Sequence, residues 1–166
     1  MASNGVRYEV VMETNGIPER LSRTAMGLDS QINSWLHNAS YIVKEEMSSR
    51  APEGVAGAMG QGLKNNISID IDPVRRTATI KPSDSIPYAD AVETGSRPHR
   101  PPMGPDSALA QWCEMKGLNV WAIAKGIELR GTKPHPYIEP TYQATKGTVG
   151  SLFNTGVMQY LERMAL

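Results

Sequence analysis

A long stretch of apolar side chains at helical spacing constrains the fold of this chain more than any other feature. Pro18 suits a first helical turn, and the pattern predicts a helix from Pro18 to about Ser49. At ~1.5 Å per residue such a helix is on the order of 45 Å long, more than a domain of 166 residues covers alone. We therefore expect part of it to contact a neighbouring molecule. The apolar positions are Leu21, Ala25, Leu28, Ile32, Trp35 or Leu36, Ala39, Val43 and Met47.

Shorter segments alternate between apolar and polar residues, as strands do. Residues 63–72 and 74–80 predict a hairpin that turns at Pro73, and residues 6–12 predict an edge strand that ends at the Asn15-Gly16 turn. The period of two places one set of side chains toward the core and the acidic set toward solvent. The inward set is Ile67, Ile69 and Ile71, and the outward set is Ser68, Asp70 and Asp72.

The second half of the chain predicts further helices. A short helical turn follows Pro87 and stops at Gly95. Residues 106–131 predict a helical hairpin inserted between sheet elements, with caps at Asp106-Ser107, Gly117 and Asn119, and with Val120, Trp121, Ala124 and Ile127 facing inward. A last helix runs from about Pro140 to Met164, where glycines 147, 150 and 156 indicate close packing or a kink.

These elements predict an α+β fold in which long N-terminal and C-terminal helices pack on a small antiparallel sheet. The length predicts one domain, residues 1–166, with one core. Seventeen basic and seventeen acidic residues cancel, which argues against generic DNA binding. A lone Cys113 excludes an internal disulfide and fits a reducing compartment. We expect neither a secretory signal nor a membrane span.

Residues that could carry chemistry have structural interpretations. His37 falls on the polar side of the long helix, while His99 and His135 sit in proline-rich loops without metal-ligand spacing, so we expect no metal and no cofactor. Asp90 and Glu93 lie one helical turn apart. We interpret Glu93 as an acceptor for backbone N–H groups of an adjoining loop, and keep a small hydrolase using Glu93 with His99 or His135 as an alternative.

Two loops carry clustered basic residues, and all of these except His135 are the candidate partner contacts. If the fold brings them together, they form a basic rim able to bind an acidic partner surface or DNA phosphates. No aromatic residue interleaves with them in the sequence, which weakens a site based on base stacking. The residues are Arg97, His99 and Arg100 in one loop, and Arg130, Lys133 and His135 in the other.

Several short motifs occur in a fixed order along the chain. After the long helix come Ala51-Pro52 and the segment 62–67, then a hairpin and a P-Y-A-x-x-V-E-x-G motif, then P-Y-I-x-P before the last helix. In this order the chain resembles a family of tailed-bacteriophage neck proteins, the tail-completion or putative tail-component proteins. The motif residues are Pro87, Tyr88, Ala89, Val92, Glu93 and Gly95, followed by Pro136, Tyr137 and Pro140.

The resemblance implies a non-enzymatic virion protein, assembled in the host cytoplasm as a homo-oligomeric, typically hexameric, ring. Such a ring joins the head connector to the tail tube, contacts neighbouring connector and tail proteins, and encloses a channel through which genomic DNA passes. The helical hairpin and the N-terminal strand lie outside the family pattern. The related roles of tail terminator and head-closure protein therefore stay open. The loops 97–105 and 54–62 are the segments expected to reach adjacent proteins.

Overall fold

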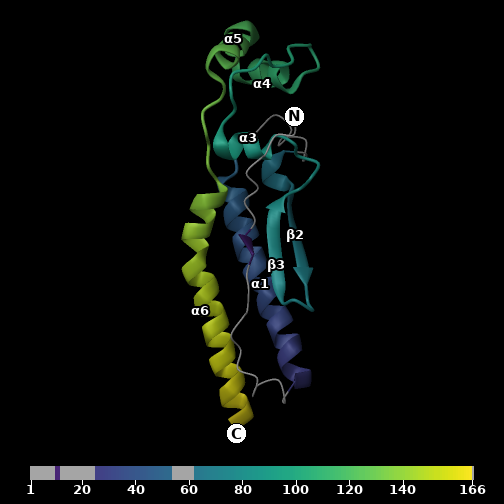
Figure 1. The fold of residues 1–166 in the computed structure, drawn as a ribbon, viewed down its shortest axis with the longest axis vertical. Helices are drawn as coiled ribbons and strands as arrows, with labels where there is room; N and C mark the ends of the chain where they lie inside the picture. The colour runs from purple at the N-terminus through teal and green to yellow at the C-terminus, as the bar shows by residue number, and fades with distance from the viewer. Residues whose placement is uncertain (1–9, 12–24, 54–61, 166) are drawn as a thin grey trace. The chain divides into compact units, whose positions relative to one another are not determined.

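The computed structural model describes residues 10–11, 25–53 and 62–165, and its ribbon is drawn in Figure 1. The predicted α+β class is confirmed, with two long helices and a small sheet. The glycine-rich segment 54–62 is expected to reach adjacent proteins, but residues 54–61 of it lie outside the described residues. The elements in chain order are β1 (Val10–Val11), α1 (Ala25–Arg50), the 3-10 turn η2 (Leu63–Asn65), β2 (Ile67–Asp72), β3 (Thr77–Pro82), α3 (Ala89–Thr94), α4 (Ala108–Lys116), α5 (Val120–Arg130) and α6 (Ile138–Ala165).

The chain divides into two compact units, and the single domain of residues 1–166 stays a prediction. Among the described residues, unit 1 holds 48–53, 62–67 and 82–138, and unit 2 holds 10–11, 25–47, 68–81 and 139–165. The chain passes between the units at the ends of its long elements, because α1 and β3 end in unit 1 and β2 and α6 begin there. The spacing of apolar residues indicates which side of a helix or strand is buried, but it does not indicate which helices and strands share a core.

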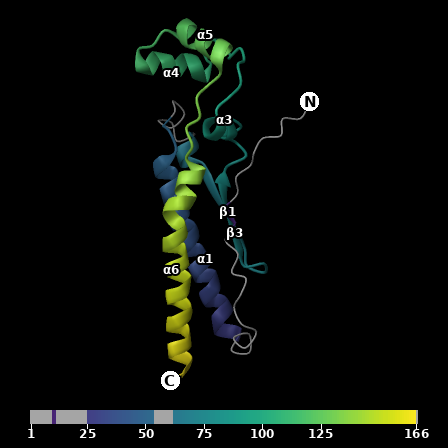
Figure 2. The same ribbon diagram turned by 60° about the vertical axis from the view of Figure 1, so that its left-hand side comes forward.

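In unit 2, α1 lies between α6 and the sheet (Figures 1 and 2). Its predicted apolar stripe is confirmed from Leu28 to Met47, where every member except Trp35 is buried. Trp35 is half-buried and meets Phe153 of α6 edge to face, with ring centroids 6.3 Å apart. The chain itself therefore covers the stripe from Leu28 to Met47, and this part of α1 needs no neighbouring molecule. The predicted start at Pro18 lies outside the described residues.

The sheet has the strand order β1-β3-β2, so β1 is an edge strand as predicted. Both hairpin strands begin later than the alternation indicates. Residues 63–65 form a 3-10 turn, because the side-chain amide of Asn66 donates to the Gly62 carbonyl at 2.8 Å. Residues 73–76 form a turn in which the Asp72 carboxylate accepts from the Val74 and Arg75 backbone N–H groups, each at 2.9 Å.

In unit 1, α4 and α5 form the predicted helical hairpin with the predicted caps. The Ser107 hydroxyl accepts from the Ala110 N–H, Gly117 closes α4 in the left-handed conformation, and the Asn119 side chain accepts from two N–H groups of α5. The hairpin does not lie between strands, since α3 precedes it and α6 follows it. Trp121 was predicted to face inward, but it is 68% exposed while Ala124 is buried.

Helix α6 starts at Ile138, two residues before the predicted Pro140. Of its three glycines, Gly156 is explained by close packing. A Cβ there would lie 2.5 Å from Cε2 of Trp35, whereas the Gly147 and Gly150 positions have no neighbouring atom within 4 Å.

Candidate functional site

Glu93 joins two distant segments of unit 1. Its side chain is buried, and Oε2 accepts hydrogen bonds from the backbone N–H groups of Tyr137 at 2.7 Å and Ile138 at 3.0 Å. This confirms the interpretation of Glu93 as an acceptor for backbone donors. Ile138 begins α6, so the carboxylate also faces the positive end of a helix dipole. Glu93 thereby holds the start of α6 against α3.

Helix α3 is short, and its buried face spans a single turn that ends at Glu93. Ala89 and Glu93, four residues apart, are the buried positions of α3, and Ile86 is buried just before it. The His135 N–H donates to the Val92 carbonyl at 2.8 Å, which adds a third backbone link between the same segments. The motif residues thus form one joint, although Pro87 and Pro136 themselves are exposed and Pro140 is half-buried.

Tyr137 is the largest fully buried side chain of the described protein. Burial raises the pKa of its hydroxyl above the usual value, and the charges of Glu93 and Asp90 and the nearby Tyr88 raise it further. The ring is therefore neutral at physiological pH. A neutral, buried aromatic ring beside a buried carboxylate is a structural arrangement, since neither group is open to solvent.

Ser96 and Thr132 form a two-sided bridge at the base of the α4–α5 hairpin. Each backbone N–H donates to the partner's carbonyl, at 3.2 and 3.1 Å, and the two hydroxyl oxygens lie 3.0 Å apart. A glycine with positive φ precedes each bridge residue, Gly95 at 76° and Gly131 at 74°. A Cβ on Gly131 would lie 1.8 Å from the Ser96 carbonyl oxygen, so only glycine fits there. The bridge brings the two basic loops together.

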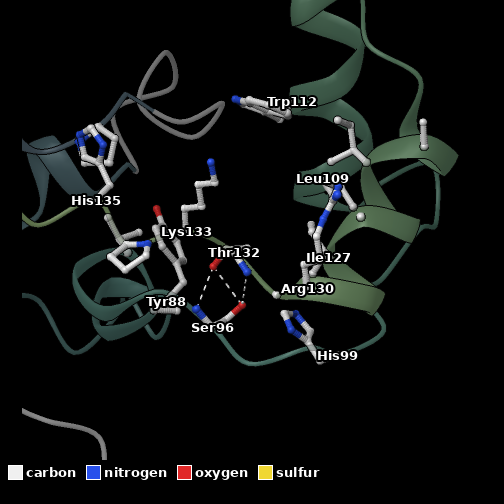
Figure 3. Close-up of a pocket in the computed structure, with 18 residues that line it drawn as sticks. Tyr88, Ser96, His99, Leu109, Trp112, Ile127, Arg130, Thr132, Lys133 and His135 are labelled. Carbon is white, nitrogen blue, oxygen red and sulfur yellow. Dashed lines mark hydrogen bonds between the residues drawn. The ribbon is translucent and has the colours of Figure 1, made fainter.

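A pocket of about 1160 Å³ opens beside this bridge, and we call it the hairpin pocket (Figure 3). Its walls come from α3, α4 and α5, and its rim from the two loops. The apolar lining includes Tyr88, Ala91, Val92, Leu109, Trp112, Ile123 and Ile127, and the basic lining is His99, Arg130, Lys133 and His135. The structure thus places three predicted contact residues, His99, Arg130 and Lys133, in one site together with His135.

The other two candidate contacts lie elsewhere. Arg97 is exposed and does not line the hairpin pocket. Arg100 lines a smaller pocket of about 340 Å³, which also includes Trp121, Lys125 and Glu128. Lys125, which forms an ion pair with Glu128 at 2.9 Å, lowers the pKa of the Glu128 carboxyl, and the charge of Arg100 lowers it further.

Sequence reasoning missed the aromatic part of the site. Tyr88 and Trp112 lie outside the basic loops in the sequence, yet both line the hairpin pocket with residues of these loops. No aromatic residue interleaves with the basic cluster in the sequence, but the fold places two of them in the same pocket. The available signal was the apolar face of α4, whose Leu109 and Trp112 are only half-buried.

The residues considered for catalysis or metal binding do not form one cluster, although His99 and His135 both line the hairpin pocket. His37 and Asp90 are exposed, Cys113 is buried, and Glu93 is used by backbone donors. Within the described ranges, no group of three or more His, Cys, Asp or Glu side chains is placed to hold a metal ion. None of the described helices combines the length and apolar character that crossing a membrane requires.

Comparison of the chain with protein-family models, with curated proteins and with solved structures finds no match.

Proposed function

We propose that this chain is a structural virion protein of the head-to-tail neck of a tailed bacteriophage, of the tail-completion type. In this role it forms a homo-oligomeric, typically hexameric, ring between the head connector and the tail tube, with genomic DNA in its channel. It performs no bond-making chemistry. Tail-terminator and head-closure roles in the same neck are the closest alternatives.

The observation that supports this proposal is the joint made by Glu93. The P-Y-A-x-x-V-E and P-Y-I-x-P motifs are the most distinctive parts of the resemblance, and hydrogen bonds from Tyr137 and Ile138 to Glu93 connect them directly. Because residues of the two motifs are hydrogen-bonded to each other, the two motifs form one joint in the fold. Their joint occurrence then supports a common architecture, since two independent short matches would not be expected to meet.

The same joint favours a structural role over a hydrolase. A catalytic carboxylate must reach a substrate proton or a reacting atom within hydrogen-bond distance. The buried Oε2 of Glu93 is occupied by two backbone donors, and the side chain is only 6% exposed. Its bonds stabilise the start of α6.

The proposal is tested in the phage that encodes the chain. Deletion of the gene is expected to leave filled heads and separate tails, visible by negative-stain imaging, and mass spectrometry of wild-type particles should detect the chain. Complementation with Glu93→Ala should fail to restore joining, whereas Asp90→Asn, an exposed carboxylate on the same short helix, should restore it. Infectious particles that lack the chain, or a chain found only in the particle-free fraction, would contradict the proposal.

A further inference from the structure

The hairpin pocket combines an apolar interior with an entirely basic set of charged side chains. Leu109, Trp112, Ile123 and Ile127 supply the hairpin side of the lining, and Tyr88 supplies the opposite side, where α3 begins. None of the described residues that line the pocket is acidic. The chain as a whole is neutral, so this is a local imbalance of charge.

The cations of the pocket are available to a partner. Among the described residues, no carboxylate lies within ion-pair distance of Arg130 or Lys133, whereas Lys64, Arg76 and Lys125 each have one. A methyl group on Gly126 would lie 3.4 Å from Nη2 of Arg130, so the guanidinium folds back along α5 beside the pocket. Figure 3 shows the Lys133 side chain extended from the bridge toward the Trp112 side.

We propose that the hairpin pocket binds an acidic segment of a partner protein that also carries a large apolar side chain. The apolar side chain lies between Tyr88 and the α4–α5 wall, where it is removed from water. The flanking carboxylates pair with Lys133 and with Arg130, whose guanidinium can hold a carboxylate through two parallel hydrogen bonds. His99 and His135 extend the polar rim along the segment.

The size of the pocket fits a peptide segment. Small-molecule sites usually occupy roughly 300–1,000 Å³, and the hairpin pocket at about 1160 Å³ exceeds that range. A peptide segment of several residues can fill this volume and contact both the apolar and the basic parts of the lining.

The lining favours an acidic peptide over a nucleic acid. Non-specific binding of single strands depends on aromatic platforms that stack successive bases along a continuous basic groove. Leu109, Ile123 and Ile127 make the α4–α5 wall mainly aliphatic, and the two aromatic side chains of the lining, Tyr88 and Trp112, lie on different sides of the pocket, where they do not form a continuous stacking platform. Aliphatic walls suit Leu, Phe or Met side chains of a protein.

This inference goes beyond the proposed function because it concerns the purified chain and does not depend on neck assembly. The full-length protein is immobilised and a random twelve-residue peptide library is selected against it. Enriched peptides are then synthesised with fluorescein and titrated by fluorescence anisotropy. Enrichment of Asp or Glu beside Leu, Phe, Met or Trp is expected, with affinity that falls as salt increases.

Pocket and control variants locate the binding. The double variant Arg130→Gln/Lys133→Gln is expected to weaken the enriched peptides at least tenfold. The double variant Lys116→Gln/Lys125→Gln removes the same amount of charge from α4 and α5 outside the pocket, and should change affinity less than about twofold. All four residues are exposed, so both variants should fold, which circular dichroism checks.

Three outcomes would overturn the proposal. The first is a selection that yields no enriched sequence, or a neutral or basic one. The second is peptide binding that is equal in the pocket and control variants. The third is tighter binding of a twelve-nucleotide oligothymidine than of any selected peptide, lost in the Arg130→Gln/Lys133→Gln variant, which would assign the pocket to nucleic acid. Each leaves the proposed neck function to its own test in particles.

Discussion

The carboxylate of Glu93 lies 2.7 Å from the backbone nitrogen of Tyr137, although the two residues are 44 positions apart in the chain. Both residues are buried, at 6% and 0% exposure. The whole α4–α5 hairpin lies between them in sequence, so this bond closes the loop from which the hairpin projects. The geometry of the hairpin base therefore depends on a charged side chain held by backbone donors.

Removing the Glu93 carboxylate should destabilise the protein strongly. Glu93→Ala leaves two buried N–H groups without their acceptor, and each such loss costs ~1–3 kcal/mol. We expect a decrease of about 2–4 kcal/mol in the free energy of unfolding, measured by urea denaturation. Glu93→Gln keeps an acceptor oxygen but loses the charge that faces the α6 dipole, so about 1 kcal/mol is expected.

Asp90→Asn provides the matched control for Glu93. Asp90 is exposed one turn earlier on α3, and its loss should change the free energy of unfolding by less than about 1 kcal/mol. An equal effect at Asp90 and Glu93 would show that the charge of α3 matters and that the two hydrogen bonds do not.

Alkaline pH should reveal the burial of Tyr137. Burial raises the pKa of Tyr137 in the folded protein, while an unfolded tyrosine ionises near pH 10. Above about pH 10 the folded state therefore binds more protons than the unfolded state, and the free energy of unfolding falls by up to ~1.4 kcal/mol per pH unit. Tyr137→Phe should lack this fall, and the exposed Tyr142→Phe should retain it. Parallel wild-type and Tyr137→Phe profiles up to pH 11.5 would contradict the prediction.

Local structure could be predicted from the sequence where a residue determines the backbone of the residues next to it in the chain. The caps at Ser107, Gly117 and Asn119 are such cases, and they set the limits of α4 and α5 correctly. The predicted start of β2 was wrong because the alternation of apolar and polar residues cannot reveal that the Asn66 side chain closes a 3-10 turn. The division into two units was not predicted either, because it depends on contacts between segments that are far apart in the sequence.

The candidate site was predictable in its parts but not as a pocket. The basic residues and the role of Glu93 followed from loop composition and helix position. The meeting of the two loops depends on Ser96 and Thr132, which carry no sequence signal beyond the glycine before each of them. Tyr88 was singled out as a motif residue, and only the folded chain shows that it faces the same space as Trp112.

Gly131 should tolerate no other residue. Alanine there adopts a strained positive φ of 74° and its Cβ would meet the Ser96 carbonyl at 1.8 Å, so we expect a loss of more than about 3 kcal/mol. Gly117 also has a positive φ, 63°, but has open space around it, and Gly117→Ala should cost only about 1–2 kcal/mol. Urea denaturation with hydrogen exchange at the Ser96 and Thr132 amides separates the two. Equal losses would mean that backbone strain alone determines the effect and that the bridge contributes nothing.

Alanine at two glycines of α6 should change stability in opposite directions. Gly150 has no neighbouring atom within 4 Å, so Gly150→Ala should stabilise the protein by about 0.5–1 kcal/mol through helix propensity. At Gly156 the added methyl would meet Cε2 of Trp35 at 2.5 Å, and the overlap should outweigh that gain, for a net loss of about 1–2 kcal/mol. Trp35→Leu makes room for the methyl. In a thermal-denaturation double-mutant cycle, Trp35→Leu/Gly156→Ala should therefore lose less than the sum of the single losses. An additive cycle would place the cost of Gly156→Ala elsewhere than at the Trp35 ring.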